Sequence, residues 1–137
     1  YRVSRPHVIA LGKDGTRWVD VERNPDVPII DGVVVVRVEA GLFFANADHV
    51  RGRITALVDE STEVVILDAE TSPYIDVSAA RMLLDLAASL KRNNVVFRIA
   101  RDIGQFRDIL AGTEDEESLP VYPTVTDAIA AGGEEDR

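Results

Sequence analysis

Three short runs of apolar, mostly β-branched residues predict strands that are buried on both faces. Val33 to Val38 reads VVVVRV, Val64 to Leu67 reads VVIL, and Val95 to Ala100 reads VVFRIA. Near-continuous apolar runs of this length are typical of central strands in a parallel sheet, because helices cover both of its faces. Two weaker runs upstream, His7 to Leu11 and Trp18 to Val21, are separated by a glycine-containing turn and predict a further pair of strands.

Two longer segments follow the helical period. Asn46 is a candidate N-cap, and the apolar positions after it have helical spacing: Val50, Ile54, Leu57 and Val58. Asp76 opens a second helix that Asn93-Asn94 ends, and its apolar stripe consists of Leu83, Leu86, Ala87 and Leu90. Both patterns predict helices that pack one face against a sheet.

Two shorter helices are predicted near the end of the chain. Asp102 to Gln105 has the form of a capping box, and Gly112 is a candidate end for the helix that follows it. Thr124 to Asp127 is a second candidate capping box, ahead of an alanine-rich segment. The order of elements is β-β-β-α-β-α-β-α-α, which predicts an α/β fold with a mixed sheet, parallel in its centre and covered by about four helices.

The sequence shows no internal repeat and no linker that would divide it, so residues 1–137 are predicted to form a single domain. The acidic end, from about 131 to 137, is expected to fray. No apolar run approaches the ~20 residues that a membrane-spanning helix needs. The chain begins at Tyr1 rather than at methionine, which favours a piece of a longer protein.

Charge and composition narrow the classes of function. The formal net charge is −9, which disfavours binding to nucleic acid or to an anionic lipid surface. The chain has no cysteine, so disulfides and thiolate chemistry are excluded within it. Neither His7 nor His49 has a partner at metal-ligand spacing, and no catalytic or phosphate-loop motif is present. We therefore expect no enzyme activity, no metal and no cofactor.

The loop before the second helix is the most informative segment for function. It places Asp76, Val77 and Ser78 at a helix N-terminus, where unsatisfied N–H groups favour an anion or a phosphoserine. The alternative is that Asp76 simply caps the helix and Ser78 is an ordinary residue of its first turn.

A second candidate site lies at the carboxyl ends of the predicted strands. Arg101 and Asp102 follow the third apolar strand, and together with Ser78 and Arg81 they could bind an anion or a nucleotide. Ion pairing of the arginines with a nearby aspartate is the alternative, with these candidates: Asp76, Asp85 and Asp102.

Several of these segments together resemble the STAS domain of SulP-type anion transporters (STAS stands for sulfate transporters and anti-sigma factor antagonists). The residues that carry the resemblance in the first half are Glu22, Asn24, Pro25, Gly32, Arg37 and, above all, the segment Leu42-Phe43-Phe44-Ala45-Asn46-Ala47. The second half matches through Val65 to Ala69, Ile75 to Ala79, Ala100-Arg101 and Tyr122 to Ile129.

The resemblance implies a regulatory or interaction domain on the cytoplasmic side of the membrane, in the same chain as a sulfate-type anion transporter. Its partners would be the membrane domain of that chain and possible regulatory proteins or a nucleotide, but not nucleic acid. Ser78 matches the serine that is phosphorylated in the anti-sigma factor antagonists, whereas Val77 and Ala79 depart from that family's usual serine and glycine. Two alternatives therefore stay open: a free-standing phosphoswitch at Ser78, and a nucleotide-sensing domain.

Overall fold

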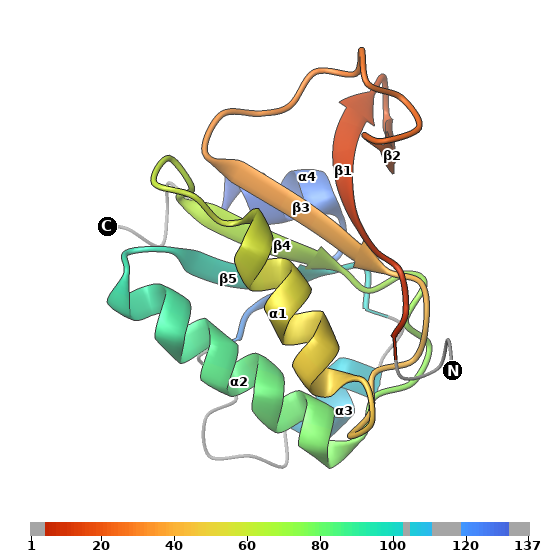
Figure 1. The fold of residues 1–137 in the computed structure, drawn as a ribbon, viewed down its shortest axis with the longest axis vertical. Helices are drawn as coiled ribbons and strands as arrows, with labels where there is room; N and C mark the ends of the chain where they lie inside the picture. Colours follow the sequence, from red (N-terminus) through yellow and green to blue (C-terminus); the bar gives the residue numbers. More distant parts are fainter. Residues whose placement is uncertain (1–4, 103–104, 111–118, 132–137) are drawn as a thin grey trace.

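A six-stranded sheet in the order β2-β1-β3-β4-β5-β6 runs through the middle of the molecule (Figure 1). The computed structural model describes residues 5–102, 105–110 and 119–131. The strands are β1 (Val8–Asp14), β2 (Arg17–Asp20), β3 (Val33–Val38), β4 (Val64–Asp68), β5 (Val96–Ala100) and β6 (Val121–Tyr122). β1 is antiparallel to β2 and β3, while β3, β4, β5 and β6 are mutually parallel, so the predicted mixed sheet with a parallel centre is confirmed.

Helices cover both faces of this sheet. They are α1 (Ala47–Leu57), α2 (Val77–Arg92), α3 (Gln105–Leu110) and α4 (Val125–Ala130). In Figure 1, α1 and α2 lie in front of the sheet and α4 lies behind it. Residues along β3 alternate between the two cores, since Val36 packs with the α1 and α2 side and Val35 with the α4 side. The apolar run of β3 is thereby explained, because neither face of the strand is left to water.

The two main helices follow the predicted patterns. α2 buries its entire apolar stripe, and Asp76 is its N-cap. Asn46 is the N-cap residue of α1, but its side chain makes no capping bond, and Val58 follows the helix as its C-cap. Within the described residues, no helix has the length and apolar character needed to cross a bilayer.

In the last third of the chain the structure adds one strand to the prediction and changes the details of one helix cap. Strand β6 was not predicted, because it has only two residues and exists through its pairing with β5. The Asp102 carboxylate caps α3 by accepting from the N–H groups of Phe106 and Arg107. Thr124 caps α4 as predicted, with its hydroxyl accepting from the N–H of Asp127 at 3.0 Å. Gly112 and residues 132–137 lie outside the described residues.

Candidate functional site

Two loops at the carboxyl ends of β3 and β4 lie side by side and are joined by main-chain hydrogen bonds. The N–H of Leu42 donates to the carbonyl of Tyr74 at 2.8 Å, and the N–H of Asp76 donates to the carbonyl of Leu42 at 3.0 Å. Leu42 and Ile75 form an isolated parallel bridge, and both side chains are buried. The bridge fixes the loop after β3 against the start of α2.

Asp76 connects the two loops a second time, through its side chain. One carboxylate oxygen accepts from the N–H of Ala79 at 2.8 Å and so caps α2. The other accepts from the N–H of Phe44 at 2.9 Å. The predicted cap is confirmed, and the same carboxylate also holds a residue 32 positions earlier in the chain.

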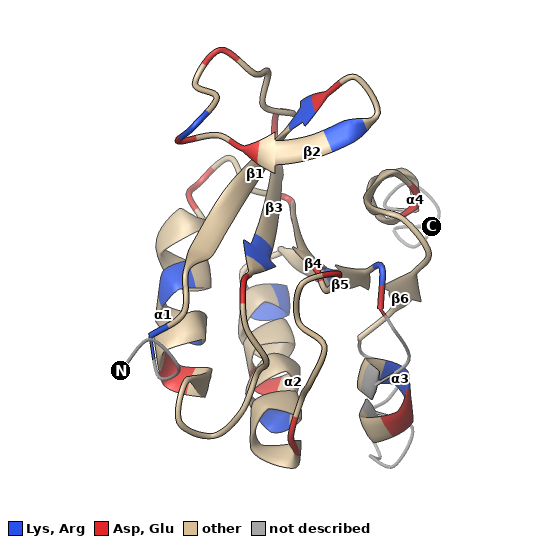
Figure 2. Ribbon diagram, turned by 90° about the vertical axis from the view of Figure 1, so that its right-hand side faces the viewer, with Lys and Arg blue, Asp and Glu red and all other residues tan. Residues whose placement is uncertain are grey.

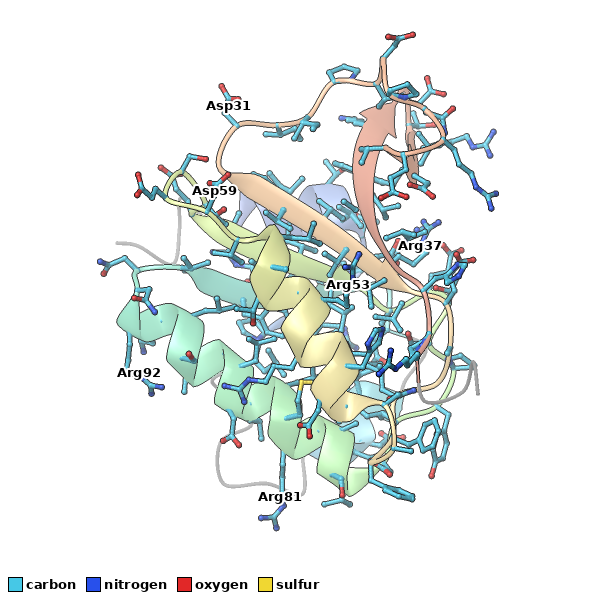
Figure 3. All side chains as sticks on the ribbon, in the orientation of Figure 1. Asp31, Arg37, Arg53, Asp59, Arg81 and Arg92 are labelled. Carbon is cyan, nitrogen blue, oxygen red and sulfur yellow. The ribbon has the colours of Figure 1, made fainter. Side chains whose placement is uncertain are left out.

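Ser78 lies in the first turn of α2 with its side chain exposed. No other described residue forms a hydrogen bond with its hydroxyl. The side chain of Val77 is 58% exposed beside it. Arg81, one turn further along, points away from the sheet into solvent (Figure 3). The hydroxyl of Ser78 is therefore open to solvent.

An exposed apolar surface surrounds this helix start, and we call it the docking patch: Phe44, Tyr74 and Val77. These side chains are 74%, 54% and 58% exposed, and they account for three of the five large exposed hydrophobic residues in the described part of the chain. The ring of Phe43 supports that of Phe44 edge to face, with centroids 5.9 Å apart. Exposed apolar groups that gather in one place commonly mark an interaction surface. The sequence did not reveal this exposure, because Phe44 directly continues a buried apolar run.

Asn46 explains how the loop after β3 keeps its shape. Its side chain is fully buried, its Oδ1 accepts from the N–H of Phe43 at 3.0 Å, and its Nδ2 donates to the carbonyl of Gly41 at 2.8 Å. The side chain thus ties the loop instead of capping α1. A buried amide that bonds to main-chain groups on both sides fixes the backbone between them, which here carries the exposed ring of Phe44.

A charge cluster occupies the same end of the sheet, between the central strands. It consists of Arg37, Asp68, Glu70 and Arg101. The fully buried carboxylate of Asp68 accepts from the guanidinium of Arg37 at 3.0 Å and from the Nε of Arg101 at 3.1 Å. Arg101 also pairs with Glu70 at 2.6 Å. The hydrogen bond with Asp68 raises the pKa of the Arg101 guanidinium above its usual range.

The candidate anion site is only partly assembled. Arg101 and Asp102 follow β5, but the Asp102 carboxylate is used to cap α3 and Arg101 is used by the charge cluster. Arg81 points away from the sheet, whereas Arg101 is held in the charge cluster by Asp68 and Glu70. The predicted alternative of ion pairing holds for Arg101, but its partners are Asp68 and Glu70 and not Asp76, Asp85 or Asp102.

Figure 2 shows how the charged residues are distributed along the ribbon. Within the described ranges, no group of three or more metal-binding side chains could hold an ion. The features that the structure does bring together at this end are a helix start with an exposed serine, an apolar docking patch and an internally neutralised charge cluster. This combination suits binding to another macromolecule better than it suits bond-making chemistry.

Comparison with known proteins agrees with the geometry. Residues 24–128 match the model of the STAS domain. A probable sulfate transporter of Mycobacterium tuberculosis is 34% identical over 114 residues, a match that covers 80% of this chain and 20% of the relative. The chain thus spans about a fifth of the length of the curated relatives that it matches.

Two solved structures show the same fold. The murine solute carrier 26 family member A9 anion transporter, in its inward-facing state, superposes with a TM-score of 0.83 at 19% identity, covering 97% of this chain and 23% of the transporter. The unphosphorylated anti-sigma factor antagonist SpoIIAA gives a TM-score of 0.56 at 16% identity, covering 79% of this chain and 94% of the antagonist. With the family model matched over most of its length and the parallel-centred sheet in place, the chain belongs to the STAS domain family.

Proposed function

We propose that this chain is the cytoplasmic regulatory and interaction domain of a SulP-type anion transporter of the sulfate class. The observation that carries the proposal is the 34% identity with a probable sulfate transporter over most of this chain and only a fifth of the relative. The remaining four-fifths of such a protein would contain the membrane part. In this proposal the domain binds and regulates, and it takes no part in catalysis or in the transport path.

The docking patch is the surface through which we propose that the domain contacts its membrane part. Its aromatic rings are exposed, and the side chains of Asp76 and Asn46 hydrogen-bond to the main chain of the loop that carries Phe44. A preorganised apolar surface loses little conformational entropy when it binds, which favours docking. The occupant in this proposal is the membrane domain of the same chain.

Ser78 provides a means of regulating that contact. Phosphorylation would add about −1.5 to −2 charges next to Asp76, in a turn that already has one carboxylate. The phosphate would compete for the helix N–H groups and repel the carboxylate that holds the N–H of Phe44. Modification would therefore loosen the loop that presents the docking patch.

Site-specific thiol labelling tests the docking role, and within this chain the introduced cysteine is the only thiol. The labelling rate of Phe44→Cys is compared between the isolated chain and the full-length parent chain in membranes, with Asp85→Cys on α2 as the exposed control. Docking predicts several-fold slower labelling at position 44 in the parent chain and no change at position 85. Equal rates at position 44 in both contexts would contradict the docking role.

The Ser78 proposal has its own test. Ser78→Asp should speed labelling at position 44 in the parent chain, whereas Ser78→Ala should leave it unchanged. A nucleotide site at Ser78, Arg81, Arg101 and Asp102 has less support, because Arg101 is already paired and Arg81 points outward. Titration of the chain with adenine and guanine nucleotides, followed by amide shifts, tests that alternative: shifts confined to these residues would support it.

A further inference from the structure

A pocket opens where β1 separates from β3, at the other end of the sheet from the docking patch. Strand pairing between β1 and β3 runs from Val8 opposite Val38 to Ala10 opposite Val36. Beyond that point β1 pairs with β2 instead, and Figure 1 shows it curving away from β3. The gap is a pocket of about 360 Å³ between the two strands and the end of α1, which we call the β1–β3 pocket.

The lining of the pocket is largely apolar. Its floor comes from the side chains and backbone of Leu11, Val33, Val34, Val35 and Leu57. Two further lining residues, Ile29 and Ile30, are 67% and 37% exposed and belong to the segment that leads into β3. They are the remaining two of the five large exposed hydrophobic residues among those described. The volume lies at the lower end of the ~300–1,000 Å³ range of ligand pockets, which suits one or two side chains of a partner.

The charges around the pocket have a single sign. Asp31 and Asp59 are among the lining residues, and the lining contains no lysine, arginine or histidine. Figure 3 shows both aspartates at the same corner of the molecule. Among the described residues, hydrogen bonds to the Asp59 carboxylate reach only its Oδ1. This oxygen accepts from the N–H of Ser61 at 2.8 Å, from the hydroxyl of Ser61 at 2.7 Å and from the hydroxyl of Thr62 at 3.3 Å. Its Oδ2 therefore keeps its capacity to accept from a partner.

We propose that the β1–β3 pocket binds a lysine or arginine side chain flanked by apolar residues of another polypeptide segment. The apolar floor would bury the neighbours and the stem of the cation, while Asp31 and Asp59 would neutralise its head. The source of the segment rests on the proposed function: it is a cytoplasmic loop of the membrane domain. Such loops carry an excess of lysine and arginine, which complements an acidic domain with a net charge of −9.

The pocket chemistry can be tested on the isolated chain with two matched peptides. Both are acetylated, amidated pentapeptides with two leucines on either side of the central residue, which is arginine in one and neutral citrulline in the other. Amide shifts are recorded while each peptide is added. The arginine peptide should bind more tightly, with shifts confined to the lining residues. Each of Asp31→Asn and Asp59→Asn should weaken its binding by about three- to fivefold, the size of a partly exposed ion pair. Asp85→Asn, an exposed change on α2, is the control and should have no effect.

Several results would overturn the proposal. Equal binding of both peptides would show that the aspartates recognise no cation, and shifts centred on Phe44 and Tyr74 would place binding at the docking patch. No saturable shift would exclude the pocket as a peptide site. Concentration-dependent self-association that Ile29→Ser abolishes would identify a second copy of the chain as the occupant. Because these measurements use only the isolated chain, their failure leaves the labelling test of the transporter proposal unaffected.

Discussion

Replacing Asp68 with asparagine tests how strongly the charge cluster holds the central strands together. The carboxylate is fully buried and accepts five hydrogen bonds, from the Nε and a terminal nitrogen of Arg37, the same two groups of Arg101, and the N–H of Glu70. Asparagine keeps the shape of the side chain, but its NH₂ group cannot accept hydrogen bonds from the donors that it faces. It also removes the negative charge that the guanidinium groups of Arg37 and Arg101 share.

The expected cost follows from burial. Removing one member of a buried ion pair typically costs about 3–5 kcal/mol. The side chains of Arg37 and Arg101 are 18% and 29% exposed, so water can partly replace the lost acceptor, and we expect about 2–4 kcal/mol. With a urea dependence of about 1.5 kcal/mol per molar, a loss of about 3 kcal/mol lowers the unfolding midpoint by about 2 M.

Urea unfolding followed by the fluorescence of the single tryptophan measures this change. Asp85→Asn is the matched control, since the same substitution on the exposed face of α2 should change stability by less than about 0.5 kcal/mol. A loss for Asp68→Asn as small as that of the control would refute the reasoning. In that case the two arginines would be satisfied by solvent, and the cluster would contribute nothing to the sheet.

Three further predictions concern other parts of the chain. Leu83→Ala or Leu86→Ala should cost about 2–5 kcal/mol in the same assay, because both side chains are buried against the sheet, and values near zero would contradict the packing of α2. Asp76→Ala should cost about 1–2 kcal/mol and speed amide exchange at Phe44, whereas Asp76→Asn, which keeps an acceptor, should cost less. Hydrogen bonds from Ser61 lower the pKa of Asp59, so a carboxyl titration by NMR should show a midpoint below the ordinary aspartate value, and Ser61→Ala should raise it. Since the pKa of Asp59 is lower in the folded state, this turn stabilises the fold near neutral pH and loses that effect as the pH falls through the folded pKa. An ordinary aspartate midpoint in the unsubstituted chain would contradict this prediction.

Much of the fold was predictable because its signals are local. The run from Val33 to Val38 is apolar on both faces, which only a doubly covered strand explains, and β3 has these same bounds. The stripe of α2 and its Asp76 cap follow from helical spacing and capping chemistry in the same way. By contrast, β6 has two residues between Pro120 and Pro123 and depends wholly on its neighbour β5.

The candidate site was less predictable, because its contacts join residues that lie far apart in the sequence. Arg37 and Asp68 meet only because the parallel register of β3 and β4 sets them opposite each other. One sequence signal was available. Arg37 interrupts one apolar run and Asp68 follows another, and both residues lie at the carboxyl end of a central strand. The exposure of Phe44 had no such signal. It depends on the Leu42 bridge and the Asn46 side chain, which turn the loop outward after one buried residue.

The central claim is that this STAS domain works as part of a larger transporter chain in a membrane. Cell fractionation and a blot with an antibody raised against this domain test it most directly. We predict a band far larger than 15.0 kDa in the membrane fraction. A band near 15.0 kDa in the soluble fraction would contradict the account and favour a free-standing switch controlled at Ser78.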